Sequence, residues 1–286
     1  MTISQCQRAT VFVFLLLLAF VGSCLGKSAS DIESRLTAIG SDTAGAVLPI
    51  TLWRHDPIMA ADVVGTAFLV TGDGYFVTAA HVLGVEILKM GRLSVILKQR
   101  DGSGSGLSFD VIEKDESHDL ALCKIENFVP MKSGRAPLDT DVPVATLDIS
   151  AETLQQGQFV AIVGFPLGSW NPALQFGNVA ATEIVNSAPS MRVPAGQRDL
   201  LQINVSGNKG DSGGPVISLR TGKVVGVIIQ LVPAPVLSAI PVPEMQNSGM
   251  MVALPAKWVR DLLTRNHVVS SEHKPREKLI LKTAGN

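Results

Sequence analysis

A serine set among glycines is the residue of this chain best placed to do chemistry. The segment reads Gly207-Asn208-Lys209-Gly210-Asp211-Ser212-Gly213-Gly214-Pro215. Acyl transfer needs a serine hydroxyl that stands exposed on a tight turn, with backbone N–H groups beside it aimed at the developing oxyanion. A plain glycine-rich turn between strands does not need glycine on both sides of a fixed serine. The segment therefore predicts that Ser212 is a nucleophile.

Two further segments could supply a base and its orienting acid. Thr78-Ala79-Ala80-His81-Val82 follows a strand-like stretch, and Asp119-Leu120-Ala121-Leu122-Cys123-Lys124-Ile125 begins another. The chain order is then His81, Asp119, Ser212. Chymotrypsin-type enzymes use this order, whereas subtilisins and α/β-hydrolases use others.

On these motifs the chain resembles the trypsin-fold (chymotrypsin-clan) serine peptidases, and among them the bacterial HtrA/Deg-like branch. The T-A-A-H, D-L-A-L-x-K-I and G-x-S-G-G-P motifs carry the resemblance, together with Val163-Gly164-Phe165-Pro166-Leu167-Gly168 and Phe176-Gly177-Asn178-Val179. It covers about residues 45–265. The resemblance implies two β-barrels with the active site in the cleft between them, and hydrolysis of polypeptides without a cofactor.

Each catalytic residue then has an expected role. Ser212 is the nucleophile, and His81 is the general base that later protonates the leaving amine. Asp119 accepts the other imidazole N–H and holds the tautomer. The N–H groups of Gly210 and Ser212 form the expected oxyanion hole. The alternatives are a solvent-facing histidine at 81 and a strand-initiating carboxylate at 119.

The remaining histidines lack such a context. They are His55, His118, His267 and His273. We expect the side chain of His118 to point away from that of Asp119, because neighbours on a strand face opposite sides. No catalytic role is assigned to any of the four.

The specificity pocket is expected to be uncharged. Trypsins carry an aspartate six residues before the nucleophile, and the corresponding residue here is Ser206. Two strands would supply the walls, with the side chains Ile228, Ile229, Leu231, Met251 and Val252. The prediction is a preference for a small or medium apolar residue before the scissile bond.

Two features depart from the family pattern. Asp211 stands where trypsins have the aspartate that pairs with a freed N-terminus, yet no activation junction precedes the first barrel. A buried carboxylate needs a partner, and Lys209 or a group of backbone N–H groups are the candidates. The segment 230–248 mixes prolines with apolar residues. It is either an insertion packed on the barrel or an apolar wall for substrate or another subunit.

The first 26 residues are typical of a leader. Arg8 is the only charge before Lys27, and an apolar run extends from Val11 to Val21. This run is too short to span a bilayer but suits a secretory signal. Cleavage before Lys27 would release a periplasmic or secreted protein. Alternatively, the Val21-Gly22-Ser23-Cys24 segment resembles a lipobox, which would leave the protein anchored through a lipid on Cys24.

Composition narrows the partners and the chemistry. The formal net charge is −1, which gives no reason to expect nucleic acid or an anionic membrane as partner. Cys6 and Cys24 fall in the leader and leave Cys123 alone, so no intrachain disulfide is expected and a bacterial envelope enzyme is favoured. No metal-ligand spacing or phosphate-binding loop occurs, and we expect neither metal nor cofactor. Assembly into a homo-oligomer is left open.

The pattern of short β-branched runs separated by glycine predicts an all-β fold. The expected architecture is two antiparallel six-stranded β-barrels, with a short N-terminal helix at about 31–39 and a C-terminal helix that starts at Pro255. The expected segments after the leader are 27–45, a first barrel 46–142, a second barrel 143–266 and a polar tail 267–286. The tail is too short for a PDZ module.

The sequence thus predicts an exported serine endopeptidase that acts on unfolded or misfolded proteins through an acyl-enzyme. A processing protease with one target fits the same residues. A catalytically silent binding protein on the same scaffold is less favoured, because such proteins usually lack a triad residue and none is missing here.

Overall fold

The computed structural model describes residues 30–54, 61–98, 104–126, 128, 146–183, 199–235 and 245–269. The predicted leader with Cys24, most of the segment between the barrels, residues 236–244 and nearly all of the polar tail lie outside these residues. The chain divides into two units, residues 1–41 and 42–286. A helix occupies residues 30–43, where a shorter one over 31–39 was expected.

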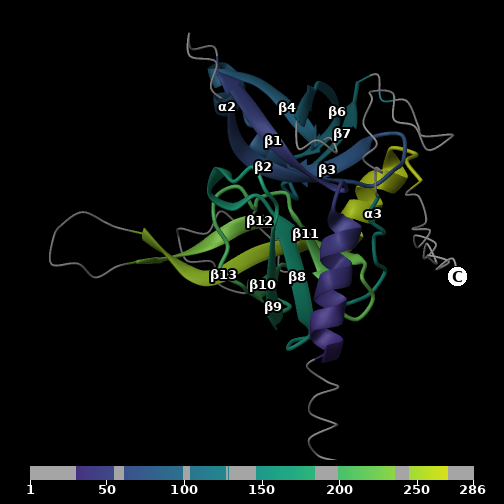
Figure 1. Ribbon diagram of the computed structural model, residues 1–286, viewed down its shortest axis with the longest axis vertical. Coiled ribbons are helices and arrows are strands. Elements are labelled where there is room, and N and C mark those ends of the chain that lie inside the picture. The colour runs from purple at the N-terminus through teal and green to yellow at the C-terminus, as the bar shows by residue number, and fades with distance from the viewer. Residues whose placement is uncertain are drawn as a thin grey trace, which may run out of the picture. The chain divides into compact units, whose positions relative to one another are not determined.

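The first sheet of the second unit has seven antiparallel strands in the order β5-β4-β1-β2-β3-β7-β6 (Figure 1). They are β1 (Val47–Arg54), β2 (Ala61–Leu69), β3 (Tyr75–Ala79), β4 (Gly91–Lys98), β5 (Gly104–Leu107), β6 (Phe109–Asp115) and β7 (Leu120–Ile125). The sequence predicted a six-stranded barrel here. The difference arises because Gly104–Leu107 forms a strand of its own, β5, which Ser108 separates from β6. These two edge strands are joined by that single residue, which makes the sheet curl towards a barrel.

The second sheet is a closed antiparallel barrel of six strands, as predicted, in the order β10-β13-β12-β11-β8-β9. The strands are β8 (Phe159–Gly164), β9 (Ala173–Ala181), β10 (Leu201–Asn204), β11 (Pro215–Ser218), β12 (Val224–Pro235) and β13 (Met245–Pro255). Alternate side chains of these strands, among them Ile162, Ile203 and Val216, form its buried core. Short helical turns position the site residues: η1 (Ala80–Leu83), α2 (Val85–Met90) and η2 (Pro166–Gly168).

The strands β12 and β13 continue into the segment 230–248, for which the sequence left open a packed insertion or an apolar wall. Their pairing extends to Pro235 opposite Met245, whereas β10 pairs with β13 only as far as Met251. The outer part of this hairpin therefore pairs only with itself among the described residues, and Figure 1 shows it projecting from the barrel.

The C-terminal helix α3 (Ala256–Arg265) begins directly after Pro255, as predicted. Proline is favoured beside the first turn of a helix because its missing N–H is not needed there. Val259, Leu262 and Leu263 are buried, while Trp258 is only partly buried. Among the described residues, no helix is long and apolar enough to cross a membrane.

Candidate active site

His81 and Asp119 are in direct contact. The Asp119 Oδ2 atom lies 2.7 Å from His81 Nδ1, and its Oδ1 atom accepts a hydrogen bond from the His81 backbone N–H at 2.8 Å. The Asp119 carbonyl also accepts from the Ala80 N–H at 3.0 Å. The three bonds fix the imidazole with its Nδ1 towards the carboxylate, which leaves Nε2 for another partner.

The turn that carries Ser212 packs against the ends of the strands that carry His81. The Thr66 N–H donates to the Ser212 carbonyl at 2.8 Å. Gly213 has a φ of +86°, and a Cβ placed there would lie 2.1 Å from the Thr66 carbonyl oxygen and 2.9 Å from the Ala79 nitrogen. Only glycine fits this position. The close approach brings Ser212 to the segment that ends in His81.

Within the described residues, no hydrogen bond joins Ser212 Oγ to His81. Catalytic hydrogen bonds of ligand-free enzymes are often long and shorten only when substrate binds. The His81 side chain is 47% exposed, so water reaches the face that a substrate would cover.

Among the described residues, three backbone N–H groups between Asn208 and Gly214 have no hydrogen-bond acceptor: that of the exposed Lys209 and those of Gly210 and Ser212. The N–H groups of Asn208, Asp211, Gly213 and Gly214 all donate to acceptors within the protein. Gly210 and Ser212 are the predicted oxyanion-hole residues. Free N–H groups on the nucleophile itself and on the residue two positions before it are the donors that an oxyanion hole of this type requires.

A hydrogen bond from η2 orients the Gly210 N–H. The Leu167 N–H donates to the Lys209 carbonyl at 2.6 Å. Because C=O and N–H point in opposite directions in a trans peptide, the Gly210 N–H faces away from η2. Gly210 itself has a φ of +103°, and a Cβ there would lie 2.1 Å from the Phe165 carbonyl oxygen. Glycine is required at this position.

Thr66 is a site residue that the sequence analysis missed. Its buried hydroxyl donates to the Gly210 carbonyl at 2.6 Å and accepts from the Phe165 N–H at 3.2 Å. One side chain of the first sheet therefore holds two segments of the second barrel beside Ser212. No motif marks it, because its partner Gly210 is 144 residues away.

Asp211 is fully buried. Its Oδ2 atom accepts from the Asn208 N–H at 2.9 Å and from Gln175 Nε2 at 3.0 Å. Its Oδ1 atom has no hydrogen-bond partner among the described residues. Burial raises the pKa of Asp211, and the two hydrogen bonds offset this only in part. A backbone N–H was one of the expected partners; Gln175 was not foreseen, and the exposed Lys209 is not among the partners.

The predicted specificity residues do not share one face. Ile228 and Met251 belong to the buried core of the second barrel, with Leu231 packed against it. Val252 follows Met251 on β13 and so faces the other side of the sheet. Ile229 is also outside this core cluster; it lies at a register shift in β12. These two residues are therefore not placed beside the other three.

Ser206 is exposed, as the mouth of a pocket requires. The next residue, Gly207, packs tightly on Met251: a Cβ there would lie 1.5 Å from the Met251 Cε atom. Met251 thus fills the space behind the backbone at this point.

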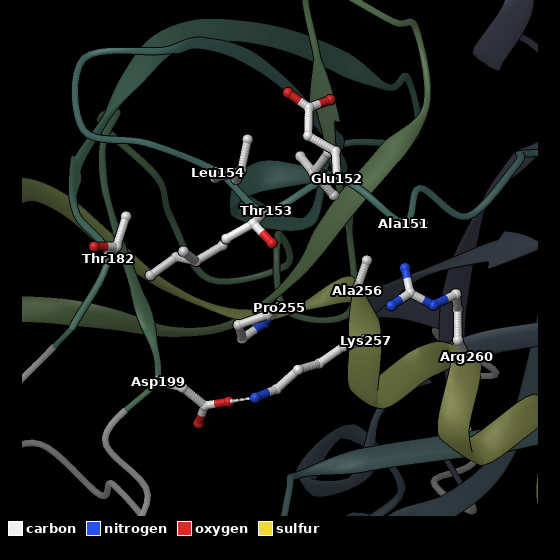
Figure 2. Close-up of a pocket in the computed structure, with 12 residues that line it drawn as sticks. Ala151, Glu152, Thr153, Leu154, Thr182, Asp199, Pro255, Ala256, Lys257 and Arg260 are labelled. Carbon is white, nitrogen blue, oxygen red and sulfur yellow. Dashed lines mark ion pairs between the residues drawn. The ribbon is translucent and has the colours of Figure 1, made fainter.

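A pocket of about 270 Å³ lies elsewhere, between α3 and the end of the second barrel (Figure 2). None of the predicted site residues lines it. Its two cations are already engaged, since Lys257 forms an ion pair with Asp199 and Arg260 donates to the Ser150 carbonyl. The pocket is therefore separate from the chemistry around Ser212.

Comparison with known proteins identifies the family of this chain. Residues 65–227 match the family described as the trypsin-like peptidase domain. The match spans more than half of the chain. The protein therefore belongs to the family of trypsin-like serine peptidases.

Its relatives among characterised proteins are of the HtrA type. It is 33% identical over 231 residues to serine protease HTRA1 of Xenopus tropicalis, covering 78% of this chain and 41% of the relative. It is 30% identical over 211 residues to serine protease HTR4 of Rattus norvegicus, covering 72% of this chain and 38% of the relative. The chain thus spans about two fifths of these relatives.

Solved structures show the same fold. The Deg5 structure matches with a TM-score of 0.55 at 20% identity, covering 80% of this chain and 92% of Deg5. The active form of the Rv3671c protease from M. tuberculosis matches with a TM-score of 0.53 at 22% identity, covering 83% of this chain and 86% of that one.

Proposed function

We propose that this protein is an exported serine endopeptidase that hydrolyses unfolded or misfolded polypeptides through an acyl-enzyme on Ser212. One observation carries the proposal. The turn with the free N–H groups of Gly210 and Ser212 is held by the first sheet against the segment that carries the His81–Asp119 pair. Trypsin-like peptidases need this combination of nucleophile, oriented base and oxyanion donors.

In the first half-reaction, Ser212 Oγ attacks the carbonyl carbon of the scissile peptide bond while its proton moves to His81 Nε2. Asp119 stabilises the resulting imidazolium through the Nδ1 contact of 2.7 Å. The carbonyl oxygen becomes an oxyanion that accepts hydrogen bonds from the Gly210 and Ser212 N–H groups. The C–N bond then breaks, and His81 returns the proton to the leaving amine.

In the second half-reaction, a water molecule attacks the acyl-enzyme ester. His81 takes one proton from this water and passes it to Ser212 Oγ as the ester bond breaks. The free carboxylic acid leaves, and the enzyme is restored. Loss of one oxyanion donor typically costs about 3 kcal/mol of transition-state stabilisation.

The proposal of export rests on the leader pattern of residues 1–26. Mass spectrometry of the protein purified from its own cells distinguishes cleavage before Lys27 from lipidation at Cys24. An intact N-terminus that keeps all 26 residues would contradict export by either route.

Casein degradation by the wild-type protein and the Ser212→Ala variant tests the activity. We expect turnover to fall by a factor on the order of 10⁴ or more, since triad members act as a unit. The fold should be unchanged because only one oxygen is removed. A fluorophosphonate probe should label only the wild type. Equal labelling of the variant, or casein cleavage at the wild-type rate, would contradict the assignment of Ser212.

A further inference from the structure

The turn that leads into Asp119 has an uncommon backbone conformation. Asp119 has a φ of +53°, a left-handed conformation that is uncommon for residues other than glycine, although aspartate adopts it more readily than most. Asp115, at the end of β6, ties the turn together. Its Oδ1 atom accepts from Ser117 Oγ at 2.6 Å and from the His118 N–H at 3.2 Å. The Asp119 conformation therefore depends on where Asp115 and His118 are held.

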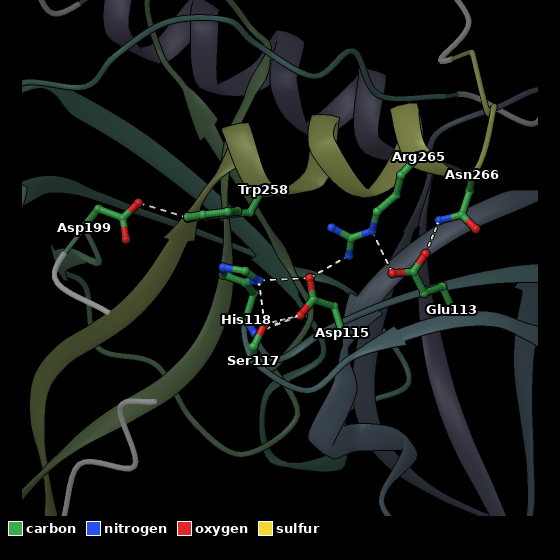
Figure 3. Close-up of polar contacts among 8 residues, drawn as sticks. All are labelled: Glu113, Asp115, Ser117, His118, Asp199, Trp258, Arg265 and Asn266. Carbon is green, nitrogen blue, oxygen red and sulfur yellow. Dashed lines mark hydrogen bonds and ion pairs between the residues drawn. The ribbon is translucent and has the colours of Figure 1, made fainter. Parts of the chain in front are cut away.

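Two side chains of α3 hold both residues (Figure 3). Arg265 Nη2 donates to Asp115 Oδ2 at 2.6 Å, and Arg265 Nε donates to Glu113 at 2.7 Å. The Trp258 ring stacks on the His118 ring, with centroids 3.8 Å apart and planes inclined by 27°. We call Asp115, His118, Trp258 and Arg265 the α3 latch.

Within the latch, His118 and Asp115 also contact each other. His118 Nδ1 lies 2.9 Å from Asp115 Oδ2, and the Asp115 side chain is only 10% exposed. Burial opposes ionisation of Asp115, but hydrogen bonds from Ser117, Arg265 and His118 outweigh it and hold the pKa of Asp115 well below its usual range. The hydrogen bond with Asp115 in turn raises the pKa of Arg265. Asp115 and Arg265 are therefore both charged throughout the physiological pH range.

The helix is itself fixed to the second barrel. Its buried face consists of Val259, Leu262 and Leu263. Trp258 Nε1 donates to Asp199 at 2.9 Å, and Arg260 donates to the Ser150 carbonyl. The α3 latch therefore connects the barrel that carries Ser212 to the turn that carries Asp119.

We infer that Arg265 and Trp258 are positioning residues that set the Asp119 carboxylate, and through it the imidazole of His81. This inference rests on the proposed function for its kinetic consequence, but the geometry of the His81–Asp119 contact can be measured without activity. A purely structural role would predict a change in melting temperature alone.

The test uses the full chain with Arg265→Gln. We expect kcat on a peptide substrate to fall roughly ten- to hundredfold, because a misplacement of about 1 Å has this effect on a catalytic group. The KM should be unchanged. The proton NMR resonance of the His81 Nδ1–H, which reports its hydrogen bond to Asp119, should shift or broaden. The variant Arg265→Lys keeps the charge but not the two-pronged geometry. Its kcat should therefore lie between that of the wild type and that of Arg265→Gln.

The matched control is Arg220→Gln. Arg220 also forms an ion pair with a carboxylate, that of Glu152, and neither residue is one of the four that make up the latch. The Arg220→Gln variant should have the kcat and the His81 resonance of the wild type. A wild-type kcat and resonance in Arg265→Gln, with only a lower melting temperature, would overturn the inference.

The remaining outcomes are also decisive. If Arg265→Gln does not fold, Arg265→Lys decides the matter: partial loss of kcat supports the latch, and wild-type values refute it. If the wild-type protein itself cleaves nothing, the proposed function fails. The His81 resonance of the same variants then still decides whether the latch sets the contact.

Discussion

At the scale of single residues, Thr66 is a structural residue that directly contacts the turn of the proposed nucleophile. Its hydroxyl and its backbone N–H contact the residues on either side of Asp211, namely Gly210 and Ser212. The shape of the oxyanion turn in the second barrel is thus set in part by the first sheet.

We predict that Thr66→Val lowers kcat roughly ten- to hundredfold and also lowers the melting temperature, because the Gly210 carbonyl and the Phe165 N–H both lose a buried hydrogen-bond partner. Valine has the same shape but cannot donate to the Gly210 carbonyl, so the neighbouring N–H groups lose their fixed direction. Oxyanion donors act only when they are preorganised. The measurement is kcat and KM on a chromogenic peptide.

Thr51→Val is the control for this change. Thr51 is also fully buried in the first sheet, and its hydroxyl bonds to Ser94, away from the site. The control should keep its activity. If both variants are equally active, Thr66 has no part in forming the oxyanion hole.

The sequence could identify some of these residues and not others, for a physical reason. Ser212, His81 and Asp119 stand in local motifs whose glycines and strand pattern are visible along the chain. Thr66 and Gln175 act through partners 144 and 36 residues away. Such contacts arise from packing and leave no periodic pattern in the sequence.

At the scale of elements, most strands were predictable because β-branched residues alternate between turns. Gly104 and Gly106 lie in β5 and pair with β4, although glycine is disfavoured in strands. Pairing with a neighbouring strand overrides this weak intrinsic preference, so the sequence pattern does not indicate β5 as a separate strand.

The turn η2 supports a prediction of its own. Leu167 has a φ of +57° and a side chain that is largely exposed, so its backbone and not its side chain serves the site. Leu167→Gly should keep full activity, because glycine adopts positive φ freely and retains the N–H that holds the Lys209 carbonyl.

Leu167→Pro should lower kcat about a hundredfold or more. Proline has no N–H and fixes φ near −65°, so the Lys209–Gly210 peptide loses its hydrogen bond and can rotate. Steady-state kinetics of both variants, with circular dichroism as a check on folding, makes the comparison. Full activity of the proline variant would show that another contact orients Gly210.

At the scale of the whole molecule, the stability of the fold should depend on Asp211. Its pKa is raised above the ordinary value of 3.8 by burial, so the folded state binds a proton more readily than the unfolded state does. Stability therefore falls as pH rises from about 4 through the raised folded value, and the loss is complete above it.

We accordingly predict that Asp211→Asn raises the melting temperature at pH 7, and that the gain shrinks as the pH is lowered towards 4. Asparagine keeps one oxygen that can accept from the Asn208 N–H and from Gln175, but it carries no charge whose burial costs free energy; each kcal/mol gained corresponds to roughly 2–4 °C at this size. Differential scanning fluorimetry across this pH range measures both curves. A variant that melts below the wild type at every pH would show that the carboxylate is stabilised by a partner.

The contact between Thr66 and the serine turn also has a consequence for the life of the chain. Under the proposed function, newly made copies of this chain are themselves unfolded polypeptides of the kind that the enzyme hydrolyses. Thr66 holds the Gly210 carbonyl of the oxyanion turn. A Cβ at Gly213 would collide with the Thr66 carbonyl oxygen and the Thr78 hydroxyl. Contacts between residues so distant in sequence form slowly. Because the contacts of Thr66 with Gly210 and Ser212 join the two halves, we expect a chain in which only one half has folded to lack peptidase activity.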